Sequence, residues 1–188
     1  MSQAGIMSPG TARKWIADRK GSTAVEFAMV APILLAMIFS IMEAGWYFFV
    51  TTSVQQANAN AARLIRTGQA QNGDLSSDAF FNEICDVVKA LGDCNEKLTI
   101  DISKFSTFAA LASDLSEPKC RDKDDPSISG AQYTKSDFGM QRDIIRVRVC
   151  FLYKPINPGL GLNLKQTKHG DRQIVAVSIF RNEPFEGS

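Results

Sequence analysis

The chain has 188 residues and a formal net charge of +1 at pH 7. A net charge near zero argues against a protein that binds nucleic acid through phosphate contacts, so we expect no nucleic-acid partner. The single histidine, His169, lies in a polar stretch, and no serine–histidine–aspartate arrangement or metal-binding cluster stands out. We therefore expect that the chain is not an enzyme and that it holds no cofactor and no metal. The length suffices for one membrane segment and one domain of moderate size.

Residues 1–21 form a basic leader. Four basic side chains and one acidic side chain give this segment a charge of +3: Arg13, Lys14, Asp18, Arg19 and Lys20. Positive residues favour the cytoplasmic side of a membrane segment. The leader therefore predicts a cytoplasmic N-terminus and a C-terminal domain on the other side of the membrane.

The densest apolar stretch of the chain follows the leader, from Ala24 to Val50. No residue from Phe27 to Met42 carries a charge. A helix needs about 20 mostly apolar residues to cross the hydrocarbon core of a bilayer, and aromatic residues such as Trp46 favour its interface. A buried core helix is the alternative, but core helices seldom stay apolar on all faces for this length. The stretch predicts one transmembrane segment, at about residues 24–50.

The helix is expected to continue beyond the membrane. The stretch from Thr51 to Arg66 contains no proline or glycine, and Gly68 provides a stop signal. Its apolar residues recur at helical spacing and form a narrow face: Val54, Ala57, Ala61, Leu64 and Ile65. We therefore predict one long helix over residues 22–68, half in the membrane and half packed on a small domain. Pro32 is expected to kink it.

Residues 69–188 are expected to form an α+β globular domain. Helical spacing of apolar residues predicts short helices over residues 78–91 and 105–115. Alternation predicts strands over residues 97–103, 143–153 and 172–181. We expect these strands to form a three-stranded antiparallel sheet that packs on the long helix.

All four cysteines follow the predicted span: Cys85, Cys94, Cys120 and Cys150. In an exported domain they would meet an oxidising environment and form two disulfides. Three pairings are possible, and the short Cys85–Cys94 loop favours that pair, with Cys120–Cys150 as the second. A zinc site needs closer ligand pairs than these spacings offer. Basic residues interleave the aspartates at 122–125 and no D-x-D-x-D-G motif is present, so a solvated loop is favoured over a calcium site.

The junction of leader and apolar stretch resembles a known processing site. Gly21 ends the leader, Glu26 stands five residues later, and Phe27 follows it. This segment resembles the G-x-x-x-x-E-F/Y site of prepilins in the tight-adherence (Tad/Flp) branch of type IV pili. The run with Ala31-Pro32 and Ile41-Met42-Glu43-Ala44-Gly45, and the ending at residues 181–185, are similar to the TadE-like minor pilins (pseudopilins) of that system. The resemblance is dense over residues 19–66 and thin in the globular domain.

This resemblance implies that a membrane-embedded prepilin peptidase cleaves after Gly21 and makes Ser22 the mature N-terminus. It implies a role in pilus assembly or initiation, and hence in adhesion. The expected partners are the peptidase, other pilins and minor pilins, the inner-membrane Tad assembly platform and membrane lipid. The protein would be a single-pass protein of the bacterial inner membrane with a periplasmic domain, and it would reach the cell exterior when built into a pilus.

Three residues of the apolar stretch are candidates for subunit assembly: Glu26, Pro32 and Glu43. The Glu26 carboxylate would pair with the Ser22 amine of its own or a neighbouring subunit, or it would be a solvated carboxylate at the helix start. Pro32 would be a hinge or a tolerated proline of a membrane helix. Glu43 would reach the outer interface or a basic group of a partner subunit.

Three other interpretations compete with a Tad pilin. One is a membrane-anchored periplasmic binding or sensing module, which the setting of Glu26 and the presence of Glu43 disfavour. Another is a pseudopilin of a type II secretion system, which Phe27 disfavours. Signal peptidase cleavage at Ala57-Asn58-Ala59 is the third, but this string lies too far from the start of the apolar run.

Overall fold

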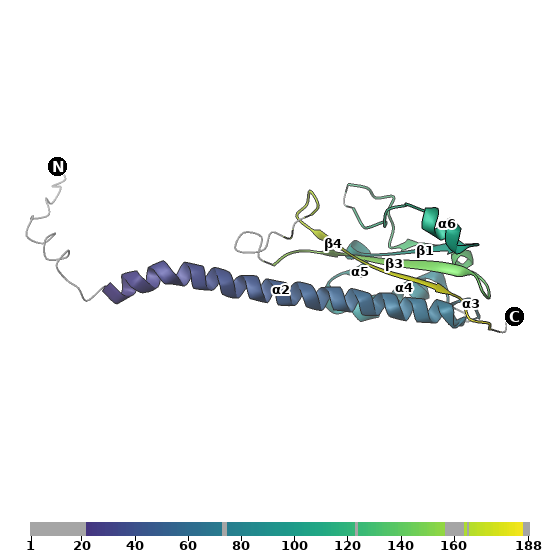
Figure 1. Cartoon of the computed structure of the whole chain (residues 1–188), viewed down its shortest axis with the longest axis horizontal. Helices are drawn as coiled ribbons and strands as arrows, with labels where there is room; N and C mark the ends of the chain where they lie inside the picture. Colours follow the sequence, from purple (N-terminus) through teal and green to yellow (C-terminus); the bar gives the residue numbers. More distant parts are fainter. Residues whose placement is uncertain (1–21, 73–74, 123, 157–163, 165, 186–188) are drawn as a thin grey trace, which may run out of the picture.

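The computed structural model describes residues 22–72, 75–122, 124–156, 164 and 166–185 (Figure 1). The leader with Gly21 lies outside the described residues. The elements in chain order are α2 (Ser22–Arg66), α3 (Gln69–Asn72), α4 (Ser77–Val88), η2 (Lys89–Leu91), α5 (Cys94–Lys97), β1 (Leu98–Phe105), α6 (Phe108–Ser113), β2 (Ala131–Gln132), η3 (Lys135–Phe138), β3 (Ile144–Tyr153) and β4 (Arg172–Arg181).

The long helix α2 is the stem of the molecule. Its N-terminal half extends away from every other described element, and its C-terminal half lies along the sheet (Figure 1). Its apolar face is buried against β3, β4 and α4, with side chains at most 1% exposed: Val50, Val54, Ala57, Ala61 and Ile65. The predicted face is confirmed except at Leu64, which is only partly buried.

Gly68 ends the stem, as predicted. Its φ of +79° is a left-handed conformation that residues with a side chain rarely adopt. A Cβ at this position would also lie 2.5 Å from the Phe185 ring. The chain therefore turns at Gly68, and the C-terminal segment packs against the turn.

The sheet has the strand order β2-β1-β3-β4. β3 pairs antiparallel with both neighbours, so Val149 lies opposite Ile100 on one side and Ala176 on the other. The α+β fold and the three predicted strands are confirmed. The predicted number of strands was wrong: the sheet has four strands rather than three, because the two-residue β2 pairs with β1 in parallel. Two residues are too short for an alternation pattern, and contact with β1 alone makes this segment a strand.

The predicted helix over residues 105–115 is shorter in the structure. Phe105 belongs to β1, where it pairs with Ile144. The helix α6 begins after Thr107, whose hydroxyl accepts a hydrogen bond from the Ala110 backbone N–H at 3.1 Å. This N-cap, rather than the apolar periodicity, fixes where the helix starts.

The face of the sheet opposite the stem carries buried charges. Arg148 is 6% exposed and pairs with Asp101 of β1, which lies directly opposite it. Arg146 contacts Asp114 at 2.7 Å, and Arg148 donates to the Ser116 carbonyl at 2.7 Å. These contacts hold residues 114–116 as a strap across β1 and β3. The backbone N–H of Ser116 and the Arg146 guanidinium lower the pKa of Asp114 to about 2.

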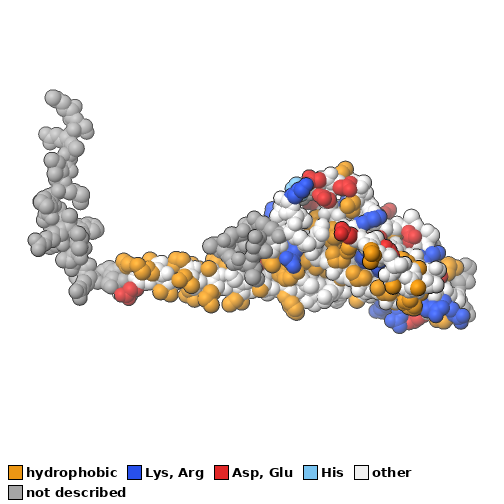
Figure 2. Space-filling model, turned by 45° about the horizontal axis from the view of Figure 1, so that its top comes forward, with side chains coloured by type: hydrophobic (Ala, Val, Ile, Leu, Met, Phe, Trp, Pro, Cys, Tyr) orange, Lys and Arg blue, Asp and Glu red, His pale blue; other side chains and the backbone are white. Residues whose placement is uncertain are grey.

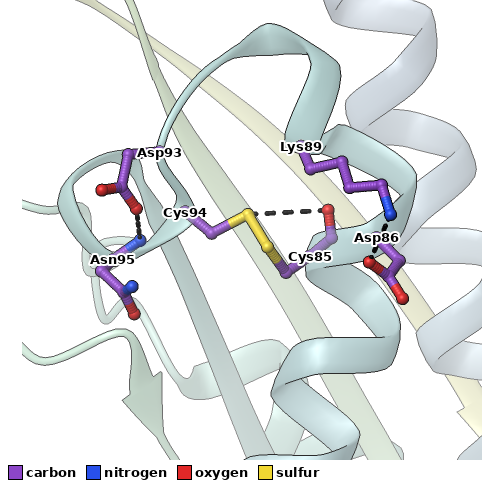
Figure 3. The surroundings of a disulfide bond; sticks show 6 residues. All are labelled: Cys85, Asp86, Lys89, Asp93, Cys94 and Asn95. Atoms are coloured by element: carbon purple, nitrogen blue, oxygen red, sulfur yellow. Dashed lines mark hydrogen bonds and ion pairs between the residues drawn. A yellow bond between two sulfur atoms is a disulfide. The ribbon is translucent and has the colours of Figure 1, made fainter.

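Two disulfides staple the domain, in the pairing that the sequence favoured. Cys85 on α4 binds Cys94 at the start of α5, as Figure 3 shows. Cys120 binds Cys150 of β3 and ties the segment that follows the strap to the centre of the sheet. Among the described residues there is no free cysteine.

The two disulfides are expected to stabilise the domain unequally. Loop-closure entropy predicts a loss of about 3.6 kcal/mol for the 30-residue Cys120–Cys150 separation and about 2.6 kcal/mol for the nine-residue Cys85–Cys94 separation. Denaturant unfolding of the full chain in detergent, with each pair replaced by serine, would measure both. A larger loss for the Cys85–Cys94 pair would contradict the entropic account.

Candidate functional site at the stem and its junction with the domain

The N-terminal half of the stem exposes apolar side chains on all faces. The helix contains an 18-residue window with a mean hydropathy of 2.2, and none of that window is buried inside the chain. Figure 2 shows this hydrophobic surface along the part of the stem that extends from the domain. From Val25 to Met42 the helix rises about 27 Å, close to the roughly 30 Å of a bilayer core. The length and composition therefore suit a single membrane span.

The helix passes through Pro32 without interruption. Figure 1 shows the stem curving over its N-terminal part. Eight residues later, the Ser40 hydroxyl donates to the Ala36 carbonyl at 2.7 Å, which also satisfies a polar group within the helix. A proline without a helix break is normal for a membrane segment, so the expected kink takes the form of a bend in a continuous helix.

Three residues of the predicted processing site, Ser22, Glu26 and Phe27, occupy the start of the stem, and Gly21 lies outside the described residues. Ser22 is the first helical residue, and Glu26 lies one turn later with its side chain exposed. Phe27 is 69% exposed beside it. Glu26 and Phe27 thus lie exposed near the N-terminal end of the stem, away from the domain.

Glu43 marks the point where the domain first covers the stem. Its carboxylate is buried, with 3% of the residue exposed. The Tyr153 hydroxyl at the end of β3 donates a hydrogen bond to it, and the Ile156 backbone N–H lies 3.2 Å and 3.3 Å from its two oxygens. Glu43 therefore has partners in its own chain, where the sequence suggested the outer interface or a neighbouring subunit.

A second pair of side chains extends this contact. Tyr47 lies one turn after Glu43, and its ring centroid is 5.7 Å from that of Tyr153. The Arg172 Nε at the start of β4 donates to the Tyr47 hydroxyl at 3.2 Å, and its guanidinium lies 5.2 Å from the Tyr47 ring centroid. We call these five residues, Glu43, Tyr47, Tyr153, Ile156 and Arg172, the junction cluster.

Residues 21–63 match the family model described as TadE-like protein. The stem of this chain is therefore similar to the TadE-like family over these residues. No curated protein matched the chain, and no solved structure did. The matched segment contains the processing-site residues, Pro32 and Glu43, and it ends three residues before the end of α2. The sheet and the short helices lie outside it.

The contacts of the junction cluster were not predicted from the sequence. In the sequence, Tyr153 is one more residue of an alternating strand. Tyr47 belongs to an aromatic group that is expected at a membrane interface. Nothing in the sequence links positions that lie 110 residues apart. The one available signal was Glu43 itself, because a carboxylate in an apolar stretch requires a partner.

The junction cluster holds the stem to the domain by a buried polar contact. Burial and the hydrogen bond to Glu43 raise the pKa of the Tyr153 phenol, so this group stays protonated and remains a donor across the neutral range. A buried carboxylate that loses one of its donors is costly. The cluster therefore fixes where along the TadE-like stem the domain sits.

One group of side chains among the described residues has metal-ligand character: Asp122, Asp124 and His169. Their ligand atoms lie within 4.8 Å of one another, and all three residues are exposed. The His169 Nε2 lies 3.1 Å from an Asp124 oxygen. The sequence did not predict that His169 joins these aspartates. Exposed pairs of this kind are common without a metal, and we assign none.

Removal of the Tyr153 hydroxyl is expected to destabilise the domain. Tyr153→Phe should lower the free energy of unfolding by about 1–3 kcal/mol, because it deprives a buried carboxylate of a donor. The same change should have a smaller effect in a Glu43→Ala background, where that carboxylate is gone. Denaturant unfolding in detergent would give the double-mutant cycle.

Glu26→Ala is the matched control for Glu43→Ala. It removes a carboxylate from the same helix at an exposed position, so the unfolding of the domain should not change. Additive effects of Tyr153→Phe and Glu43→Ala would contradict the junction contact.

Proposed function

We propose that this chain is a minor pilin of a Tad (Flp) pilus. The observation that carries the proposal is the TadE-like segment and its setting. It lies on a continuous 45-residue helix whose N-terminal part is bare and whose C-terminal half buries one face against a domain. A bare apolar half can sit in a bilayer before assembly and pack against other stems after it. The same apolar surface would thus contact lipid in the membrane and neighbouring stems in a fibre.

In this proposal the chain is a single-pass protein of the bacterial inner membrane. The basic leader favours a cytoplasmic N-terminus. The two disulfides suit a periplasmic domain, because that compartment is oxidising. Its partners would be a prepilin peptidase, other pilins, the Tad assembly platform and membrane lipid. Its role would be structural, in pilus assembly or initiation, rather than enzymatic.

Processing after Gly21 fits this arrangement better than cleavage near residue 59. Ala57 and Asn58 are buried in the stem against the domain, and Asn58 donates to the Ser178 hydroxyl of β4 at 2.6 Å. Cleavage there would cut the helix inside its packed half. Removal of the leader instead leaves the whole of α2 intact.

Intact-mass analysis of the chain expressed with a prepilin peptidase tests the proposed processing. We expect a mature chain that begins at Ser22. Gly21→Val should leave the leader attached, because a branched side chain hinders a close fit in the peptidase. Gly10→Val, the same change within the leader, should be processed normally. A wild-type chain that starts at Met1 or Asn60 would refute the proposal.

The registry role of Glu26 is tested by Glu26→Gln. We expect normal membrane insertion but loss of pili from the cell surface, because the carboxylate that pairs with a neighbouring N-terminal amine is gone. Electron microscopy and sheared-pilus fractions would measure piliation, and membrane fractionation would measure insertion. Glu83→Gln on the exposed surface of α4 is the matched control and should leave piliation unchanged. Normal piliation with Glu26→Gln would rule out the registry role.

A further inference from the structure

β4 forms one edge of the sheet. No strand among the described residues pairs with its far side. Eight consecutive residues of this edge, 173–180, contain no charge, proline or glycine. Natural proteins usually protect such edges with charges, prolines, bulges or covering segments, because an open edge pairs readily with another strand. Only the ends of β4 carry a charge, at Arg172 and Arg181.

The outer face of β4 is also apolar and uncovered. Val175, Val177 and Ile179 are 37%, 51% and 49% exposed. Their neighbours on β3 are Cys150, Arg148 and Arg146, which are buried. On this face of the sheet, the side chains of β3 are therefore buried, whereas the row of β-branched side chains on β4 is exposed.

A hollow lies between the edge of β4 and the stem. It has a volume of roughly 560 Å³, and its lining includes Ala59 and Ala62 of α2 together with Ser178 and Phe180 of β4. A strand added to β4 would lie about 4.8 Å beyond it and would point every second side chain toward the stem. The two alanines leave space for those side chains. The hollow is therefore located where an added strand would need it.

The rim of this hollow is basic. Arg63 and Arg66 of the stem line it, and Glu183 is the one acidic residue of the lining. Glu183 pairs with Arg66 at 2.8 Å, and Arg63 is exposed. Figure 2 shows basic side chains gathered at the end of the molecule farthest from the bare half of the stem. A carboxylate on an added strand would complement Arg63.

A second copy of this chain does not fit the site through its own β4. A symmetric pair of β4 strands would be antiparallel. Because β4 runs alongside the stem, the two stems would then point in opposite directions (Figure 1). In the proposed function, both copies would cross one membrane in the same orientation, which excludes this antiparallel pairing. The exclusion therefore rests on the proposed function. A symmetric pair of β4 strands is therefore excluded, and the exposed charge of Arg63 favours an acidic segment of a different protein.

We propose that the edge of β4 binds an extended segment of a partner protein by strand addition. The segment would supply backbone hydrogen bonds to β4 and alternate apolar side chains toward the hollow. It would carry a carboxylate at the end that lies over Arg63. The interaction would join the globular domain to a second protein and leave the stem free to pack in a membrane or a fibre.

The test uses the full chain in detergent micelles and two labelled peptides. Each peptide consists of ten residues in which valine and threonine alternate. One peptide carries a terminal glutamate and the other carries a terminal lysine in its place. Fluorescence anisotropy should show tighter binding of the glutamate peptide, by roughly 1.4- to 5-fold for an exposed ion pair. Arg63→Glu should reverse this preference. Hydrogen exchange should show slower exchange of β4 amides when peptide is bound.

Ile179→Lys should abolish binding of both peptides, because a lysine on an edge strand opposes pairing with another strand. Phe108→Lys is the matched control: this side chain is 57% exposed on α6, away from the hollow, and peptide binding should not change. Binding that survives Ile179→Lys, a preference that Arg63→Glu does not reverse, or concentration-dependent protection of β4 in the free chain would overturn the proposal. A chain that binds the glutamate peptide but fails to assemble pili would refute the proposed function alone.

Discussion

The structure depends on how one helix divides its surface between two environments. Over its C-terminal half, α2 buries a narrow face of small and β-branched residues against the sheet and α4. From Thr23 to Met42 none of its residues is buried within the chain. The apolar surface of the second half has to be covered by lipid or protein, because about 25 cal/mol for each Å² of apolar area opposes its exposure to water. A membrane span would satisfy this constraint, and in the proposed function so would packing of the stem against other stems.

The junction cluster stands where these two environments meet. A carboxylate in this position would oppose both membrane insertion and core packing if it lacked donors. Tyr153 and the Ile156 backbone N–H supply them from the end of β3 and the residues after it. The contact is directional, so it sets the position of the sheet along the stem more closely than apolar packing alone does. The stem and the domain are thereby joined at a defined height above the bare segment.

The TadE-like match and the fold divide the molecule in the same way. The match covers the stem to residue 63 and stops before the domain. Features that a family of membrane stems would share lie within it: the start of the helix, Pro32 and Glu43. The open edge of β4 lies on the domain, and the hollow beside it is lined by both β4 and the last turns of the stem. In the proposed function, membrane and fibre contacts would belong to the stem, and recognition of the proposed partner would belong mainly to the sheet.

Local patterns in the sequence determined much of this molecule. The apolar stretch, the stop at Gly68, the three long strands and the favoured disulfide pairing follow from composition, periodicity and loop length, which act over a few residues or turns. Tertiary structure alone decided the rest. β2 exists because β1 offers it a partner, Glu43 is satisfied by a tyrosine 110 residues away, and His169 meets Asp124 across two loops. Such contacts leave no local periodicity, since each residue is chosen for a neighbour that only the folded chain brings near.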